Sequence, residues 1–232
     1  MAGVLYYRPT AKWRLGRAWQ CVRAWHRNEL PARASTLTPL ITQAMVMRWI
    51  ANGELDLGVG VLLGFHCLLR TGELAALLKG DVKLEASSGV LLLRLTKALT
   101  RIHAMKAVSI GDPLLLRLLK VRVDQLKPGD SILGVSTGAF RKAFEMLCAE
   151  LGLSGFNFRP YSLRRGGATN LFRSTGSMSK VIARGRWASQ RTARIYVLEG
   201  MGVLAEINLS EPQRELFEWA ARQLVALAQV LG

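Results

Sequence analysis

The sequence has few cysteines and no long uninterrupted apolar run. Its 232 residues include three cysteines, Cys21, Cys67 and Cys148, an odd number without paired spacing. We therefore expect no disulfide framework and a reducing compartment. The longest uncharged apolar run, residues 57–69, has 13 residues, fewer than the ~20 that a membrane-spanning helix needs. The N-terminus also lacks the apolar segment of a signal peptide, so we expect an intracellular protein.

The sequence also lacks the residue clusters that hold catalytic metals. Its three histidines, His26, His66 and His103, are scattered, and no paired carboxylates or Cys/His groups have ligand spacing. This pattern argues against a two-metal nuclease or transposase, and we expect neither a metal nor a cofactor. His66 lies four residues before Arg70, and we expect its ring to be buried and to form a hydrogen bond with a backbone group.

Acidic residues are scarce beside basic ones. There are 32 Lys and Arg against 16 Asp and Glu, a net charge of +16. Residues 1–50 carry +7 and residues 151–200 carry +8, whereas residues 51–100 are neutral. Such a charge indicates nucleic acid or an anionic membrane as the partner. Two separated basic blocks favour a surface that follows a phosphate backbone.

Hydrophobic periodicity and capping residues predict a mainly helical chain with one small antiparallel sheet, an α+β fold. The expected helices cover residues 10–28, 38–53, 55–69, a short stretch through 78, 112–127, 136–152 and 210–231, and much of 160–209. The expected strands cover residues 81–84, 90–96 and 104–110. Residues 31–38 have the composition of a linker. We therefore expect an N-terminal helix and linker at 1–35 and one domain at 36–232.

Residues 161–196 form the most distinctive stretch, with eight Arg and Lys residues and no acid. Arg164 follows Tyr161 by three residues, Trp187 follows Arg164 by 23, and Tyr196 follows Trp187 by nine. We expect Ser162 to cap a helix with Arg164 in its first turn, where free N–H groups and the macrodipole favour an anion. An Arg fork there can bind two phosphate oxygens. Taken singly, these residues also fit a basic helix face, a core tryptophan and a half-buried tyrosine.

Together with Arg70-Thr71-Gly72-Glu73-Leu74, this stretch resembles the tyrosine recombinase (phage integrase) family. Members of that family carry an Arg in an R-x-S/G-E-L context, a hairpin Lys, H-x-x-R, a His or Trp, and a nucleophilic Tyr nine residues later. The matching positions here are Arg70, Lys97, Tyr161 with Arg164, Trp187 and Tyr196. Lys106 competes with Lys97, because the hairpin register is uncertain from sequence. The resemblance covers about residues 36–232, and SLRRGGAT with the tryptophan looks more like recombinases of eukaryotic mobile elements than like bacterial chromosome resolvases.

The resemblance implies cleavage and rejoining of double-stranded DNA, in recombination or integration, through a 3′-phosphotyrosyl bond on Tyr196. Arg70 and Arg164 would stabilise the transition-state charge, the hairpin lysine would protonate the leaving oxygen, and Trp187 would donate its indole N–H to phosphate. Glu73 would hold an Arg or a backbone amide. Location would follow the DNA, in the nucleus if the host is eukaryotic and in the cytoplasm if it is bacterial.

The resemblance also implies a homo-oligomer on DNA, joined through the C-terminal helix. We expect the helix from about Pro212 to Leu231 to dock in its own or a neighbour's groove. Its expected apolar face consists of Leu216, Trp219, Ala220, Leu224 and Leu227.

Two departures from the family pattern keep other functions open. Tyr161 stands where the family has His, and Arg165 stands where many members have another His. Of the family's N-terminal core-binding bundle, only the helix at 10–28 has a counterpart, so we expect a partial recombinase. The alternatives are a catalytically decayed DNA-binding domain and a type IB topoisomerase-like enzyme without strand exchange.

Overall fold

The computed structural model describes residues 7, 9–28, 34–93 and 106–231, in a chain that divides into two units, Met1–Arg33 and Ala34–Gly232. In the first unit, the 3-10 helix η1 (Pro9–Arg14) precedes the α-helix α2 (Gly16–Asn28). The single helix expected over residues 10–28 is therefore two elements. The origin of residues 1–35 as a remnant of a core-binding domain stays a prediction.

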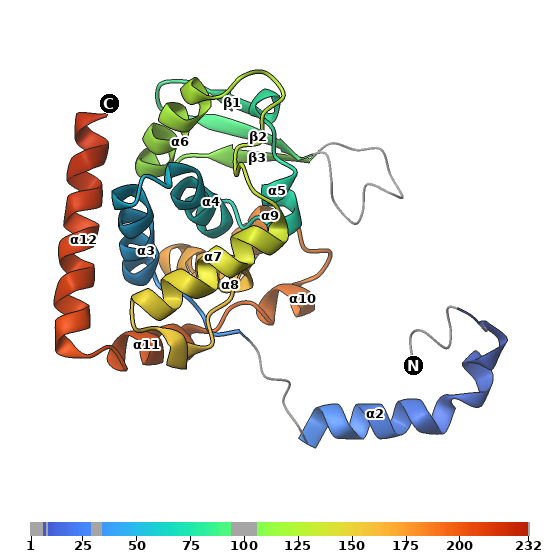
Figure 1. The fold of residues 1–232 in the computed structure, drawn as a ribbon. Helices are drawn as coiled ribbons and strands as arrows, with labels where there is room; N and C mark the ends of the chain where they lie inside the picture. Colours follow the sequence, from blue (N-terminus) through green and yellow to red (C-terminus); the bar gives the residue numbers. More distant parts are fainter. Residues whose placement is uncertain (1–6, 8, 29–33, 94–105, 232) are drawn as a thin grey trace. The chain divides into compact units, whose positions relative to one another are not determined.

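The second unit is mainly helical with one small sheet, which confirms the expected fold class (Figure 1). Its α-helices are α3 (Pro39–Ala51), α4 (Leu55–His66), α5 (Thr71–Ala75), α6 (Pro113–Gln125), α7 (Thr137–Glu150), α8 (Pro160–Thr175), α9 (Met178–Gly185), α10 (Gln190–Arg194), α11 (Glu199–Ile207) and α12 (Glu211–Val230). Short 3-10 helices are η2 (Lys79–Asp81) and η3 (Ser154–Phe156). No helix in the described ranges is long and apolar enough to cross a membrane.

The sheet is antiparallel, with the strand order β1 (Val82–Leu84), β2 (Gly89–Leu93) and β3 (Lys106–Ile110). Leu91 on the central strand pairs with Val82 on one side and Val108 on the other. All three side chains are buried, so one face of the sheet joins the core. The expected strand ends at residues 94–96 and 104–105 lie outside the described residues.

Several helices begin where the sequence offers a capping side chain. The side-chain oxygens of Thr38, Asp112, Ser136 and Ser210 accept the N–H three residues later, as expected, at 3.4, 2.9, 3.2 and 3.4 Å. Pro39 and Pro113 then occupy first-turn positions where a missing N–H costs nothing.

Helix α4 lies at the centre of the core, and residues 57–65 are all buried. Helices α3, α6 and α8 pack against it. It ends at His66, three residues before the expected end, because Leu68 adopts a left-handed conformation with φ 50°. A non-glycine residue in that conformation does not continue a right-handed helix. This turn delivers the chain to Arg70.

The approach of α8 to α4 depends on two adjacent glycines. A Cβ on Gly166 would overlap the backbone oxygen of Leu37, and a Cβ on Gly167 would overlap that of Phe65. Because those obstacles are backbone atoms, a larger residue at 166 would move α8 away from the segment before α3, and a larger residue at 167 would move it away from α4. The two glycines therefore fix the first turns of α8 against the segment before α3 and against the end of α4.

Helix α12 packs along α3 of the same chain and buries Phe217, Ala220, Leu224 and Ala228. Gln213 Nε2 donates to the carbonyls of Leu151 (3.1 Å) and Gly152 (3.2 Å), and Arg117 Nη1 donates to that of Ala228 at 3.0 Å. These bonds fix the two ends of the helix.

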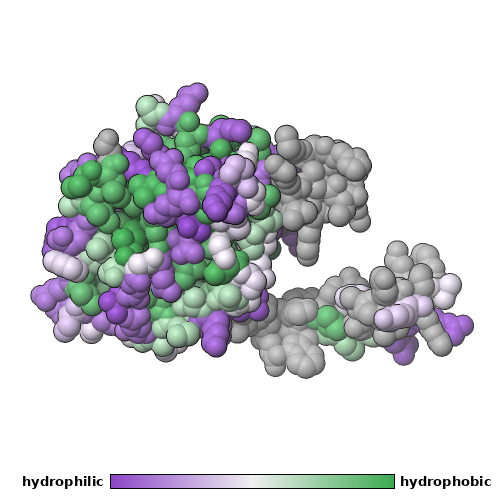
Figure 2. Space-filling model, turned by 45° about the horizontal axis from the view of Figure 1, so that its top comes forward, coloured by the Kyte–Doolittle hydropathy of each residue, from purple (hydrophilic) through white to green (hydrophobic). Residues whose placement is uncertain are grey.

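The expected apolar face of α12 was wrong in part. Leu216 and Trp219 are each 51% exposed, and Phe217 is buried in their place. The helix has apolar residues on more than one side, so periodicity alone does not select the stripe that meets the core. On the side of the unit where α12 runs, hydrophobic residues reach the surface among hydrophilic ones (Figure 2).

Candidate active site

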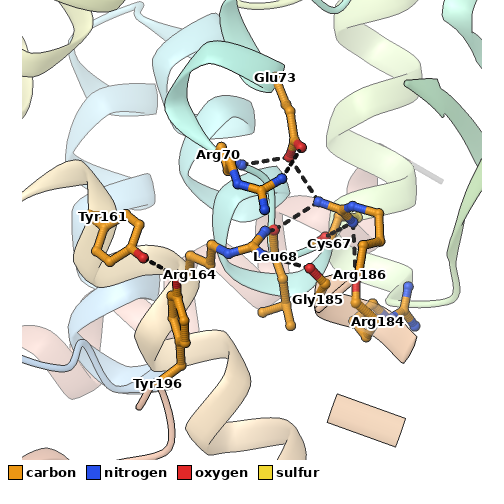
Figure 3. Close-up of polar contacts among 10 residues, drawn as sticks. All are labelled: Cys67, Leu68, Arg70, Glu73, Tyr161, Arg164, Arg184, Gly185, Arg186 and Tyr196. Atoms are coloured by element: carbon orange, nitrogen blue, oxygen red, sulfur yellow. Dashed lines mark hydrogen bonds and ion pairs between the residues drawn. The ribbon is translucent and has the colours of Figure 1, made fainter. Parts of the chain in front are cut away.

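The structure brings together Arg70, Tyr161, Arg164, Trp187 and Tyr196, whereas Lys97 lies outside the described residues. Arg70 precedes α5, Tyr161 and Arg164 lie on α8, Trp187 follows α9, and Tyr196 follows α10. The guanidinium carbon of Arg164 is 4.6 Å from the Trp187 ring centroid and 5.7 Å from that of Tyr196. Figure 3 shows Arg164 between Arg70 and the two tyrosines.

The first turn of α8 differs from our expectation. Arg159 occupies the N-cap position, Pro160 opens the helix, and Ser162 Oγ accepts the Arg159 N–H at 3.1 Å. Proline at the first position supplies a helical φ and has no N–H to satisfy. Ser162 is therefore inside the helix, and the expectation that Arg164 would lie in its first turn was wrong.

Arg164 is buried, with 1% of its surface exposed. Its Nη1 donates to the Leu68 carbonyl and its Nη2 to the Gly185 carbonyl at 2.5 Å. Burial, followed by the charges of Arg70 and Arg186, lowers the pKa of Arg164 to about 10. Its Nε is buried without a hydrogen-bond partner in the described part of the chain. Arg164 therefore keeps an unused N–H in the site.

Glu73 holds the first arginine, as expected. Its carboxylate is buried and accepts the Arg70 backbone N–H at 2.8 Å and Arg70 Nη1 at 2.7 Å. It also accepts Arg186 Nη2 at 2.8 Å. One carboxylate thus positions Arg70 from its backbone and its side chain.

Arg186 is a site residue that sequence reasoning missed. It has a left-handed backbone with φ 56° and a side chain that is 7% exposed. Besides Glu73, its guanidinium donates to three backbone carbonyls, those of Cys67, Leu68 and Arg184, at 3.2, 3.1 and 3.0 Å (Figure 3). It therefore connects the turn after α4 to the end of α9. The sequence could have suggested Arg186 as a site residue, because it stands between Gly185 and Trp187. The burial of its side chain could not be predicted from the sequence.

The site carries an excess of positive charge. The guanidinium groups of Arg70, Arg164 and Arg186 influence one another, and Glu73 is the carboxylate among the described groups that acts on Arg164. Two positive charges are therefore left uncompensated in a partly buried place. Such a place favours an anion, because opposite charges attract more strongly where water is excluded.

Trp187 packs against both Arg164 and Tyr196, and its ring centroid lies 4.5 Å from that of Tyr196. It is 7% exposed, and its indole Nε1 is buried without a hydrogen-bond partner in the described residues. A Cβ on Gly185 would overlap the indole ring. Glycine at 185 therefore makes room for the tryptophan.

The backbone around Tyr196 is tied to α8. Thr169 Oγ1 donates to the Tyr196 carbonyl at 3.2 Å and accepts the Leu198 N–H at 3.1 Å. Arg165 donates to the carbonyls of Ile195 (3.0 Å) and Ala34 (2.8 Å). Arg165, at the position where many family members have His, thus anchors the segment that carries Tyr196.

Tyr161 donates its hydroxyl hydrogen to the Tyr196 oxygen (Figure 3). Burial, and then this bond, raise the pKa of Tyr161. Burial alone would raise the pKa of Tyr196. It is nevertheless lowered, because the Tyr161 bond, the nearby Trp187 indole and the charges of Arg164 and Arg70 outweigh burial. The indole N–H is close enough to have this effect although it makes no hydrogen bond of normal geometry.

Of the two candidates for the general acid, Lys106 lies among the described residues. Lys106, the alternative to Lys97, is the first residue of β3, pairs with Leu93 and is half-buried. The strand adjoins α9, where Arg184 donates to the Ser109 carbonyl. The sheet thus lies beside the helix that leads to Trp187.

His66 lies outside this constellation. Its Nδ1 is 3.6 Å from Asp112 Oδ2, so its neighbour is a carboxylate and not the backbone group we expected. Burial lowers the pKa of His66, even though Asp112 opposes the shift. Among the described residues, no group of three or more His, Cys, Asp or Glu could hold a metal ion.

Neither a protein-family model nor a curated protein sequence matches the chain. Solved structures do match its fold. XerH site-specific recombinase bound to difH substrate, in a pre-cleavage complex, is 18% identical over 71% of this chain and 50% of its own, with a TM-score of 0.55. XerA recombinase is 19% identical over 82% of this chain and 66% of its own, with a TM-score of 0.56.

A third match is the Tn1549 transposon integrase in complex with transposon right end DNA. It is 11% identical over 77% of this chain and 68% of its own, with a TM-score of 0.57. The chain spans about half the length of the XerH recombinase. At these identities the likeness concerns the fold: the chain has the fold of the catalytic domain of tyrosine recombinases and integrases.

Proposed function

We propose that this chain cleaves and rejoins double-stranded DNA at specific sites through a covalent 3′-phosphotyrosyl intermediate, as a tyrosine recombinase acting in DNA recombination or integration. One observation carries the proposal. Two buried donors without acceptors, Arg164 Nε and Trp187 Nε1, belong to side chains that pack against Tyr196.

A phosphodiester fits the binding properties of the site. A buried N–H without an acceptor costs about 1–3 kcal/mol, and a phosphate oxygen is the kind of acceptor that Arg164 Nε and Trp187 Nε1 lack. The two uncompensated positive charges favour the same anion. The net charge of +16 on the whole chain favours binding to a long phosphate backbone.

The groups present can perform an in-line displacement. The Tyr196 hydroxyl gives up its proton, its oxygen attacks phosphorus, and the bond from phosphorus to the 5′-oxygen breaks. Negative charge grows on the non-bridging oxygens, where Arg164, Arg70 and the Trp187 N–H stabilise it. The leaving 5′-oxygen takes a proton from the hairpin lysine, Lys97 or Lys106. The reverse attack by the 5′-hydroxyl rejoins the strand and frees Tyr196.

A DNA-binding domain that does not cleave is the second candidate, because Tyr161 replaces the family His. The two candidates share a DNA-binding surface and differ in the covalent step. For either, we propose assembly of copies on DNA through α12, whose exposed face carries Leu216 and Trp219.

The test uses a nicked duplex that traps the covalent adduct because the cleaved end diffuses away. The wild-type chain should form an adduct that survives denaturing electrophoresis, and Tyr196→Phe should bind the duplex equally well but form none. Tyr7→Phe is the matched control, because Tyr7 is 83% exposed and lies in the other unit.

An adduct that persists in Tyr196→Phe would refute the assignment of the nucleophile. A wild-type chain that binds the duplex but never becomes attached would instead support the non-cleaving domain.

A further inference from the structure

The site contains a pair of phenols that are hydrogen-bonded to each other. Tyr161 lies in the first turn of α8, and its ring centroid is 5.6 Å from that of Tyr196, with the planes inclined by 52°. The Tyr196 backbone is held by Thr169 Oγ1 and by its own N–H, which donates to Ala193 at 2.9 Å. The two hydroxyls therefore meet between two anchored segments.

The pair is asymmetric. The groups that act on Tyr196 stabilise its phenolate: the cations Arg164 of α8 and Arg70 before α5, the Trp187 indole after α9, and the Tyr161 hydroxyl. Tyr161 also faces Arg164 and Arg165, but burial and the bond to Tyr196 keep its proton in place. Tyr161 is thus the donor, and Tyr196 is the group that ionises.

No imidazole is among the described groups that act on either phenol. His66, whose neighbours are Asp112 and Arg184, is not one of them. A phenol with a raised pKa stays protonated at neutral pH, so Tyr161 is not available as a base to take the proton of Tyr196. That proton must go elsewhere.

We propose that Tyr161 is a positioning residue that donates a hydrogen bond to the Tyr196 oxygen and so allows Tyr196 to attack as a phenolate formed by proton loss to solvent. In this step the O–H bond of Tyr196 breaks, and its proton goes to water or hydroxide. The electron pair left on oxygen then forms the bond to phosphorus. Tyr161 keeps its own proton throughout. The inference rests on the proposed cleavage reaction.

This role has a consequence for pH dependence. A hydrogen bond donated to a phenolate favours the charged form, so it lowers the pKa of the acceptor. The rising limb of the pH profile of cleavage should follow the ionisation of Tyr196, and deprotonation of the hairpin lysine should end it at higher pH. Loss of the Tyr161 hydroxyl should raise the pKa of Tyr196 and move that limb to higher pH.

The experiment measures single-turnover attachment to the nicked duplex from about pH 6 to 10, a range that brackets ordinary imidazole and phenol pKa values. On the limb, Tyr161→Phe should be about ten- to a hundredfold slower than wild type, as for a lost hydrogen bond to a charged group. Well above the limb, the two rates should converge. Tyr161→His should add activity near neutral pH, because an imidazole can accept the proton of Tyr196.

A second readout needs no activity. Ultraviolet titration of tyrosinate in the DNA-free protein reports all four tyrosines, and subtraction of the Tyr196→Phe curve isolates Tyr196. Tyr161→Phe should raise the pKa obtained in this way, whereas Tyr7→Phe should not.

A Tyr161→Phe variant that is slower by the same factor at every pH would overturn the inference, since a bond from Tyr161 to phosphate alone predicts that result. An unchanged rate, or an unshifted Tyr196 titration, would overturn it as well. If Tyr161→Phe does not fold, a Tyr161→His profile without added activity near neutral pH overturns it. A wild-type chain that forms no adduct at any pH would refute the proposed cleavage. The titration would then still test whether the Tyr161 hydroxyl lowers the pKa of Tyr196.

Discussion

At the scale of single residues, the bridge between Glu73 and its two arginines controls the geometry of the site. The Glu73 and Arg186 side chains are 2% and 7% exposed, whereas that of Arg70 is 40% exposed. An ion pair out of water is costly to break from one side, because the remaining charge stays buried. The bond to Arg186 therefore matters more than the bond to the Arg70 side chain.

We predict that Glu73→Gln lowers stability by about 3–5 kcal/mol, the usual cost of a broken buried pair. Glu150→Gln is the matched control, because Glu150 pairs with Arg48 at the surface, where both side chains are at least 40% exposed. Such a pair contributes about 0–1 kcal/mol. Denaturant unfolding of the two variants measures the difference, and equal losses would contradict a buried bridge at Glu73.

The motif spacing predicted the residues that meet in the site but not the partners of Arg164. Those partners are the carbonyls of Leu68 and Gly185. Leu68 adopts a left-handed conformation, and so does Arg186, which also donates to the Leu68 carbonyl. Such conformations are usually marked by Gly or Asn, and neither residue type stands at these two positions. Tertiary packing imposes them, so local sequence gives no sign.

At the scale of elements, the position of α8 on α4 decides where Tyr161 and Arg164 lie. The end of α4 is in backbone contact with Gly167, two turns or less from both residues. A displacement of α8 would therefore separate Arg164 from the Leu68 carbonyl.

We predict that Gly167→Ala destabilises the fold by about 1–3 kcal/mol, as overpacking does, and abolishes adduct formation. The added Cβ would overlap the Phe65 carbonyl oxygen, a backbone atom that cannot move away by a change of rotamer. Gly200→Ala in α11 is the control, because nothing lies within 4 Å of its Cβ position. Alanine there should be neutral or stabilising by up to ~1 kcal/mol. Similar thermal unfolding and adduct yields for the two variants would refute the close approach.

Helix starts were predictable where the cap is local, as at Thr38 and Ser136. The start of α8 was not, because a serine oxygen can accept an N–H from ahead of it or from behind it in the chain. At Ser162 it accepts from Arg159, behind it. Pro160 was the overlooked signal, since proline favours the first helical position.

At the scale of the whole molecule, α12 covers the core with one face and exposes apolar side chains on another. Its buried stripe packs on α3, while Leu216 and Trp219 face outward. Sequence periodicity predicted the helix and its need for burial. It could not choose the stripe, because that choice depends on the shape of α3 and on the bonds made by Gln213 and Arg117.

The two faces of α12 predict different effects for two aromatic substitutions, one on stability and one on assembly. Phe217→Ala should lower stability by about 3–5 kcal/mol, because it removes a ring that is 1% exposed and leaves a cavity. Trp219→Ala should change stability little, because its side chain is half exposed, but it should reduce assembly of several copies on DNA if the outer face joins them. Denaturant unfolding and sedimentation of the DNA complexes measure the two effects. Equal stability of the variants would mean that α12 does not pack in cis, and undiminished assembly of Trp219→Ala would remove the outer face as the contact.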